Sequence, residues 1–179
     1  MNELETSRKG VALFLQGWSG DVGPNRALVE KPGDGNDART TYQRATELAR
    51  LLVSQTDEAI AGARELPGDR LRAVEADADL PTGMSGVNTR VAFRAIAIGD
   101  RVAIVAVSGE VFQDYGPILT SIRSDLFMPS CGLANGYAGY IPTKAGFDYA
   151  ESYELKTTPY TPAAEGVMRA QFAKLLAQI

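Results

Sequence analysis

The chain has 179 residues, of which 45% are hydrophobic and 22% charged, and its net charge is −4, all ordinary values for one globular domain. The negative charge and the lack of any Lys/Arg cluster argue against a general nucleic-acid binder, and no apolar segment reaches the roughly 18 residues that a membrane span needs. The sequence contains no histidine and one cysteine, Cys131, which excludes an intrachain disulfide, a self-contained Ser-His-Asp triad and a histidine-rich zinc site.

The first half of the chain predicts one strand and one helix. Its opening segment, MNELETSRKG, lacks the apolar core of a signal peptide, so the localisation stays unknown. Val11–Leu15 is a short apolar run that ends at a glycine, which predicts a buried strand. Gly17–Asn25 and Lys31–Asp37 are predicted loops. From Ala38 to about Arg64 the apolar residues recur near a period of 3.6, which predicts an amphipathic helix.

Strands dominate the next part of the chain. Leu71–Pro81 predicts a strand, and the apolar runs Val91–Ile98 and Arg101–Val107 flank a Gly99-Asp100 turn, as the two strands of a hairpin do. Because the second hairpin strand is apolar on both faces, we expect it to lie inside a sheet that is covered on both sides.

Three further elements complete the pattern. Val111–Arg123 has helical spacing, with Pro117 as an awkward interior residue. Leu126–Leu133 has the pattern of another strand, and Ala163–Gln178 predicts a final amphipathic helix. The sequence therefore predicts an α/β fold, with α+β as the alternative, in which helices flank a mixed β-sheet.

Glycines follow the predicted strands at three places, which are Gly17–Asn25, Ser108–Glu110 and Asn135–Tyr140. Loops at strand ends are where α/β proteins place their sites. Either the three junctions meet at one edge of the sheet, or each glycine only makes its own turn. A phosphate-binding loop is disfavoured, because no Gly-Lys-Ser/Thr ending and no basic residue precede Arg26.

The residues at these junctions also have two interpretations. Glu110 can be a functional carboxylate or only a favourable charge at a helix start. Tyr137 and Tyr140 can be ligands or packing residues. Without histidine, proton transfer must use carboxylates, tyrosines, lysines or bound water, and a metal needs oxygen ligands unless Cys131 or another chain contributes.

Four short motifs occur in order along the chain. They are GDVGPN at Gly20–Asn25, SGE at Ser108–Glu110, NGYAGYIPT at Asn135–Thr143 and YE at Tyr153–Glu154. Together they resemble the catalytic region of the neutral/alkaline (non-lysosomal) ceramidases and their bacterial relatives, which carry G-D-V-S/N-P-N, P-G-E, N-x-Y-x-x-Y-x-x-T and a later Y-E. Each motif alone is weakly specific, whereas four in this order over most of the chain are fairly specific.

The resemblance implies roles for single residues. Glu110 and Tyr140 stand where the family has two ligands of a catalytic zinc ion. Tyr153 stands where a tyrosine lies beside the scissile amide and can donate a hydrogen bond to the developing oxyanion. Asp21 is a further candidate catalytic residue, because the resemblance brings its loop toward this site. The implied activity is zinc-dependent hydrolysis of the amide bond in N-acylsphingosine or a related lipid amide.

Two departures from the family pattern matter. Gly23 stands where the ceramidases carry their nucleophilic serine, and Ser19 has no motif support as a replacement. Two explanations are left: zinc-activated water is the nucleophile, or the substrate is a different one. The family's two histidine ligands lie upstream of the GDV loop, in a part that this sequence does not contain. Residues 1–179 are therefore expected to be a single, incomplete domain, the C-terminal half of a ceramidase-like catalytic domain.

These departures leave two hypotheses open. The leading one is a ceramidase-like zinc-dependent amide hydrolase, inactive as the isolated chain and weak in zinc binding. The alternative is a catalytically silent domain of the same fold that binds lipid or protein. A half domain also has apolar residues that its few helices cannot all cover, so we expect self-association or pairing with an N-terminal half in trans. The residues in question are Val11, Leu13, Leu15, Val105 and Val107.

Overall fold

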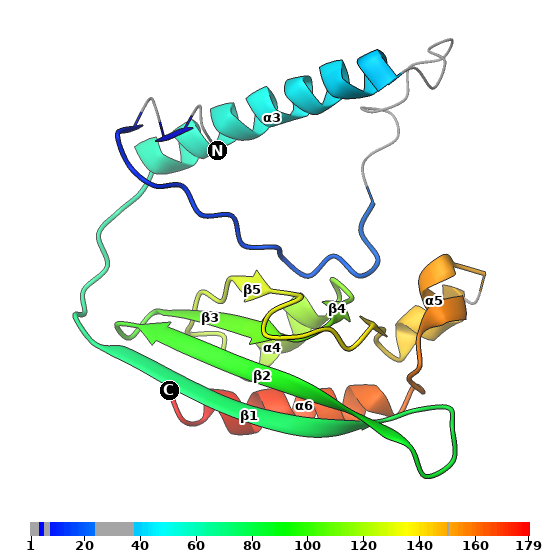
Figure 1. The fold of residues 1–179 in the computed structure, drawn as a ribbon. Helices are drawn as coiled ribbons and strands as arrows, with labels where there is room; N and C mark the ends of the chain where they lie inside the picture. Colours follow the sequence, from blue (N-terminus) through cyan, green and yellow to red (C-terminus); the bar gives the residue numbers. More distant parts are fainter. Residues whose placement is uncertain (1–3, 6–7, 24–37, 150) are drawn as a thin grey trace. The chain divides into compact units, whose positions relative to one another are not determined.

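The computed structural model describes residues 4–5, 8–23, 38–149 and 151–179, whose fold is drawn in Figure 1. They belong to two compact units. The helical unit comprises Met1–Phe14 and Gly23–Glu65, and the sheet unit comprises Leu15–Val22 and Leu66–Ile179. Within the described residues no helix is long and apolar enough to cross a membrane.

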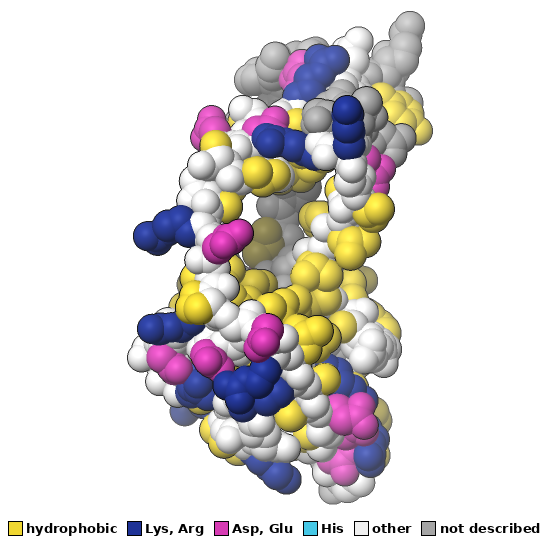
Figure 2. All heavy atoms as spheres, turned by 90° about the vertical axis from the view of Figure 1, so that its left-hand side faces the viewer, with side chains coloured by type: hydrophobic (Ala, Val, Ile, Leu, Met, Phe, Trp, Pro, Cys, Tyr) yellow, Lys and Arg dark blue, Asp and Glu magenta, His cyan; other side chains and the backbone are white. Residues whose placement is uncertain are grey.

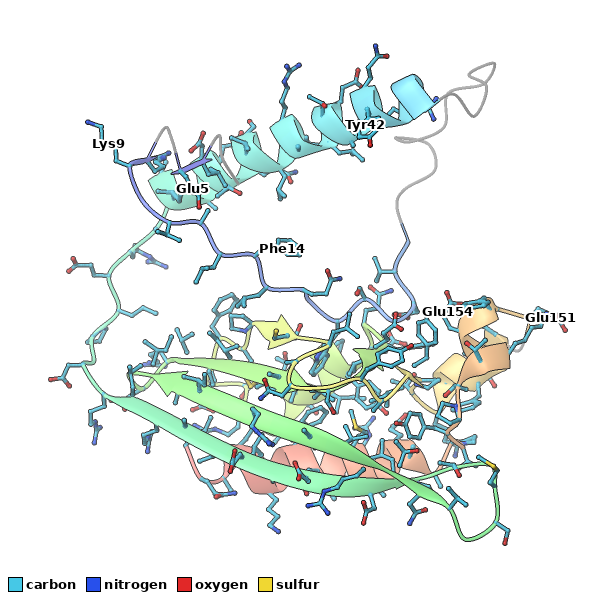
Figure 3. All side chains as sticks on the ribbon, viewed as in Figure 1. Glu5, Lys9, Phe14, Tyr42, Glu151 and Glu154 are labelled. Carbon is cyan, nitrogen blue, oxygen red and sulfur yellow. The ribbon has the colours of Figure 1, made fainter. Side chains whose placement is uncertain are left out.

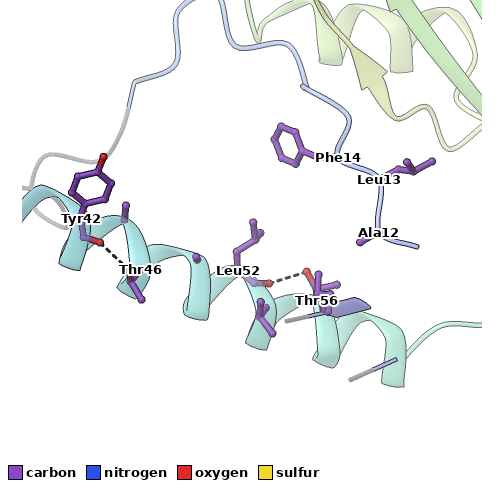
Figure 4. A pocket seen from close by; sticks show the side chains of 11 residues that line it. Ala12, Leu13, Phe14, Tyr42, Thr46, Leu52 and Thr56 are labelled. Atoms are coloured by element: carbon purple, nitrogen blue, oxygen red, sulfur yellow. Dashed lines mark hydrogen bonds between the residues drawn. The ribbon is translucent and has the colours of Figure 1, made fainter. Parts of the chain in front are cut away.

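The main element of the helical unit is α3 (Ala38–Ala61), which confirms the helix that the apolar repeat predicts. Figure 4 shows that the hydroxyls of Thr46 and Thr56 donate hydrogen bonds to backbone carbonyls four residues earlier, at 2.9 and 2.8 Å. A groove of about 730 Å³ lies between this helix and the segment around Ala12–Phe14, and all the residues that line it are uncharged. The unit therefore presents an apolar concavity. The predicted loop Lys31–Asp37 lies outside the described residues.

The prediction of a buried strand at Val11–Leu15 is wrong. The segment forms no strand, and Val11 and Leu13 are each 85% exposed. A strand needs a neighbour that pairs with its backbone groups, and among the described residues none of the strands pairs with this segment. Its backbone has a side-chain partner instead, because Glu5, labelled in Figure 3, accepts a hydrogen bond from the amide of Ala12 at 3.2 Å.

The sheet unit contains a four-stranded mixed sheet, as the sequence predicts. Its strands are β1 (Leu71–Pro81), β2 (Asn88–Ile98), β3 (Val102–Val107) and β5 (Ser130–Cys131), in the order β1-β2-β3-β5. The first two pairings are antiparallel and the last is parallel. The predicted hairpin is therefore confirmed, and its turn contains Gly99 at a φ of 60°, a conformation that favours glycine.

One face of this sheet is buried and the other is largely open. The buried face carries alternate residues of the three long strands, which include Val91, Phe93, Ala95, Val105 and Val107. On the opposite face Ile96 and Ile98 are exposed, and Arg94 forms ion pairs with Glu75 at 3.2 Å and with Asp77 at 3.1 Å. The second hairpin strand, β3, lies inside the sheet as expected, but its residues on this face are only half-buried, because α6 packs against the other face. Val105 and Val107 are fully buried all the same.

The buried face packs against α6 (Ala164–Leu176), and its central contact is aromatic. The ring of Phe172 lies 5.6 Å from that of Trp18, 5.4 Å from Phe93 and 6.1 Å from Tyr115. The predicted apolar stripe of the last helix is therefore confirmed as part of the core. Its fully buried members are Met168, Phe172, Leu175 and Leu176.

Two predicted elements are shorter than expected. The helix expected at Val111–Arg123 is α4 (Tyr115–Ile122), because Val111 pairs with another strand instead. Pro117 consequently lies in the first turn of the helix, where its missing amide costs no hydrogen bond. The strand expected at Leu126–Leu133 is reduced to β5, with one isolated bridge between Phe127 and Val102.

Charged side chains of both signs are interspersed on the surface. On the face that Figure 2 displays, Lys and Arg lie among Asp and Glu over the part of the molecule that the sheet unit occupies. The ion pairs of Arg94 and the pair between Arg90 and Asp77, at 3.0 Å, are examples from the open face of the sheet.

Candidate functional site

Two very short strands place the predicted metal ligands side by side. β4 (Glu110–Val111) and β6 (Tyr140–Ile141) pair in parallel, with Glu110 in register with Tyr140. The amide of Glu110 donates to the carbonyl of Gly139 at 2.9 Å, and the amide of Phe112 donates to that of Ile141 at 3.2 Å. The SGE and NGYAGYIPT motifs are therefore joined through their backbones.

The glycine loop before β4 packs against the same strand. The amide of Gly20 donates to the carbonyl of Val111 at 2.9 Å, and that of Gly132 donates to the carbonyl of Gln16 at 2.8 Å. A Cβ atom on Gly20 would lie 2.3 Å from the carbonyl oxygen of Glu110, and one on Gly109 would lie 3.1 Å from that of Gly139. These glycines permit the close approach of backbones that a side chain would prevent. The three glycine junctions thus meet at one place.

Two phenols lie at the carboxylate of Glu110, and a third packs against one of them. The hydroxyl of Tyr137 donates a hydrogen bond to Glu110 Oε1 at 2.9 Å. The rings of Tyr140 and Tyr153 meet edge to face, with their centroids 6.1 Å apart. Tyr153 begins α5 (Tyr153–Thr157), next to Glu154, which Figure 3 labels. Glu110, Tyr137, Tyr140 and Tyr153 are named the acid–tyrosine cluster below.

The start of α5 is fixed by its N-cap. The side chain of Ser152 accepts a hydrogen bond from the amide of Leu155 at 3.2 Å, which satisfies one of the free amides of the first turn. Thr158, at the other end, donates from its hydroxyl to the carbonyl of Tyr140 at 2.8 Å. The helix that carries Tyr153 is therefore tied to the strand that carries Tyr140.

Two phenols of the cluster, those of Tyr137 and Tyr140, have a pKa above that of free tyrosine. The hydrogen bond to Glu110 raises the pKa of Tyr137, and partial burial adds to the effect. Partial burial raises the pKa of Tyr140, and the charge of Glu110 raises it further. Both side chains are therefore neutral near pH 7 in the absence of a cation. A cation close to the carboxylate would act in the opposite direction and favour a phenolate.

Asp21 has a structural partner close to the cluster. Its Oδ1 accepts a hydrogen bond from the backbone amide of Gln113 at 2.8 Å, in the turn between β4 and α4. This contact holds the GDV loop against the turn that follows Glu110. Gly23 has no described atom within 4 Å of the place where a Cβ would be. Pro24 and Asn25, the last two residues of the loop motif, lie outside the described residues.

The donor atoms of the cluster fit zinc in kind but not in number. Carboxylate oxygen is an ordinary zinc ligand and phenolate oxygen a rarer one, and a catalytic site usually keeps three protein ligands. Glu110 and Tyr140 provide two, and the sequence has no histidine. Within the described part of the chain no group of three or more Cys, Asp or Glu residues could hold a metal ion. A complete zinc site therefore needs ligands from elsewhere.

Tyr137 is the member of the cluster that the sequence patterns do not assign. A packing role was one of its two interpretations, but its side chain is 69% exposed. The signal that points to it is local. Asn135 and Gly136 adopt φ angles of 62° and 146°, and Gly139 adopts 75°. Such a run of left-handed residues around an exposed tyrosine indicates a backbone shaped to place that side chain.

The comparisons with known proteins give one informative match. No protein-family model matches the chain, and no curated protein sequence is significantly similar to it. Among solved structures, the neutral ceramidase of Pseudomonas aeruginosa superimposes with a TM-score of 0.73 and 17% sequence identity. The match covers 92% of this chain and 36% of that chain, so the sequence spans little more than a third of the ceramidase's length. At this identity the likeness concerns the fold alone, and the fold of this chain is ceramidase-like.

Proposed function

We propose that this chain is part of a ceramidase-like, zinc-dependent hydrolase of lipid amides. In this proposal Glu110 and Tyr140 supply two oxygen ligands, and the imidazole ligands come from residues outside the 179 of this sequence. The observation that carries the proposal is the parallel register of β4 and β6, which sets these two side chains next to each other. The ceramidase-like fold supports it.

Each residue of the acid–tyrosine cluster has a chemical task in this proposal. A bound zinc ion would polarise the amide carbonyl and lower the pKa of a water molecule. Glu110 and Tyr140 would hold the ion. Tyr153 is exposed at the start of α5. Its hydroxyl would donate a hydrogen bond to the amide oxygen as negative charge develops there. Asp21 would keep the loop against the turn after Glu110 through the amide of Gln113.

The proposal predicts how the isolated chain responds to zinc. Two oxygen donors give weak binding, and no release of fatty acid from N-acylsphingosine above that of a Glu110→Ala variant is expected. Added free imidazole can take the vacant ligand positions and should strengthen the binding of zinc. Calorimetric titrations with and without imidazole measure this, with a titration of zinc into imidazole alone as the blank.

Two variants test whether Glu110 is responsible for the zinc binding measured in that experiment. Glu110→Ala should lower the imidazole-supported affinity by more than about tenfold, since it removes a ligand. Glu154→Ala, which removes a carboxylate from α5 next to Tyr153, should leave the affinity unchanged. Tight stoichiometric binding without imidazole, or equal affinities for wild type and Glu110→Ala, would contradict the proposal.

A second candidate function has its own support. Gly23 offers no nucleophile, and the groove beside α3 is lined by uncharged residues only. A catalytically silent domain that binds an apolar ligand would use that groove and would not need the cluster. Binding of a fluorescent fatty acid that is lost in Leu52→Asp, together with zinc affinity that is indifferent to Glu110→Ala, would favour this alternative.

A further inference from the structure

Tyr137 forms a hydrogen bond that its own packing does not explain. An exposed tyrosine gains little from burial, yet its hydroxyl lies 2.9 Å from Glu110 Oε1. Hydrogen bonds to a charged acceptor are stronger than those between neutral groups. Holding a mobile side chain in one rotamer costs entropy, which this bond must offset.

The backbone on both sides of Tyr137 is fixed by contacts with buried elements. Before it, the amide of Ala134 donates to the carbonyl of Val107 at 3.1 Å, at the end of β3. After it, the carbonyl of Ala138 accepts the hydroxyl of the buried Tyr160 at 2.5 Å. The left-handed residues Asn135 and Gly136 make the turn between these anchors. The position of Tyr137 is therefore fixed by the backbone contacts of its loop and not by packing of its ring.

The hydrogen bond also has a consequence for the carboxylate. A carboxylate has two oxygens, and Tyr137 donates to Oε1. Tyr140, which is in register with Glu110 on the neighbouring strand, also lies within hydrogen-bonding reach of this carboxylate. A donor on one oxygen also restricts rotation of the carboxylate about its last bond. Metal-ligating carboxylates commonly have such hydrogen-bonded partners, which orient them.

We propose that Tyr137 is a positioning residue for Glu110, which restrains the carboxylate through Oε1 and so holds it beside Tyr140 for a cation to bind. The inference rests on the proposed function, because it assigns Tyr137 a task only if Glu110 binds a cation. It differs from a ligand role: Tyr137 stays hydrogen-bonded to the carboxylate, whereas Tyr140 is the phenol that would bind the ion.

The test uses zinc as the probe, in the presence of imidazole, and two readouts. Calorimetry gives the affinity, and the ultraviolet difference spectrum gives the amount of tyrosinate formed at saturation. Tyr137→Phe should lower the affinity about 10- to 100-fold and leave the tyrosinate signal at saturation unchanged. Tyr140→Phe should abolish the tyrosinate signal. Tyr149→Phe is the matched control, because Tyr149 is similarly exposed at 74%, and it should change neither readout.

Each contrary result overturns a distinct statement. An unchanged affinity in Tyr137→Phe, when Glu110→Ala loses affinity, would refute the positioning role and keep the proposed function. A lost tyrosinate signal in Tyr137→Phe would make Tyr137 itself a ligand and would also refute positioning. Equal affinity in Glu110→Ala and wild type would refute the proposed function first. Because Tyr137 is exposed, its loss of a hydroxyl should not unfold the chain, and circular dichroism checks this.

Discussion

Single glycines decide how closely the loop approaches the acid–tyrosine cluster. Gly20 and Gly109 lie where a Cβ atom would collide with backbone, whereas Gly23 faces open space among the described atoms. The two glycines of this loop therefore differ in whether a side chain could be accommodated. At Gly20 the absent side chain permits a backbone hydrogen bond to Val111, and at Gly23 a side chain would meet no described atom within 4 Å.

Gly20→Ala should therefore be costly and Gly23→Ala should not. The added methyl group at Gly20 would lie 2.3 Å from the carbonyl oxygen of Glu110, so β4 or the loop must shift. Overpacking of this kind costs about 1–3 kcal/mol of unfolding free energy, and displacement of Glu110 should weaken zinc binding as well. Gly23→Ala should change the stability by no more than about 0.5 kcal/mol. Urea denaturation compares the two variants, and equal stabilities would refute the close approach.

At the scale of elements, α6 and the loop tryptophan close the core over one face of the sheet. Trp18 lies in the glycine loop and stacks on Phe172 of α6 at 5.6 Å, so the loop of the site and the packing helix share one aromatic contact. The indole nitrogen of Trp18 is buried and has no hydrogen-bond partner among the described residues. The loop is therefore fixed by apolar packing and by backbone contacts to β4.

Phe172→Ala should destabilise the sheet unit strongly. The ring is fully buried between Trp18, Phe93 and Tyr115, and replacing such a phenylalanine by alanine costs about 3–5 kcal/mol. Phe127→Ala is the matched control, because Phe127 is 71% exposed, and it should cost less than about 1 kcal/mol. Thermal unfolding followed by near-ultraviolet circular dichroism measures both, and similar losses in the two variants would contradict this assignment of the core.

At the scale of the whole molecule, exposed apolar residues set its behaviour in solution. Val11, Leu13, Phe14 and Leu15 are all exposed, as are Ile96 and Ile98 on the open face of the sheet. The sequence leads us to expect Val105 and Val107 among the exposed apolar residues of a half domain. Both are instead buried in the hydrophobic core. The exposed set is therefore smaller than expected, and much of it lies in one extended segment.

We predict that the chain associates with itself through these residues. At roughly micromolar to tens of micromolar concentration, exposed apolar surface of this kind promotes association. Sedimentation equilibrium should show species larger than the 19.1 kDa monomer, and a Val11→Ser, Leu13→Ser double variant should shift the distribution toward the monomer. Thr120→Ser on α4 is a neutral control. A clean wild-type monomer with cooperative unfolding would refute the prediction and the half-domain interpretation with it.

Part of the site is predictable from short motifs. The resemblance carried by SGE and NGYAGYIPT implies that Glu110 and Tyr140 lie together, as their register does, and the glycines mark the junctions. The task of Tyr137 is not predictable in the same way, since the sequence offers packing or ligation for it. Its hydrogen bond to Glu110 depends on the left-handed turn at Asn135 and Gly136, and the motif does not reveal that backbone conformation.

The sequence by itself determined the elements that have a strong period of their own. These are α3, the β2–β3 hairpin and α6, in which apolar residues recur every 3.6 or 2 positions along the chain. Only the tertiary structure decided that Val11–Leu15 is not a strand and that Glu110 and Val111 are one. The physical reason is the same in both cases: a strand exists only where another strand supplies partners for its backbone, and composition does not show which neighbour is present.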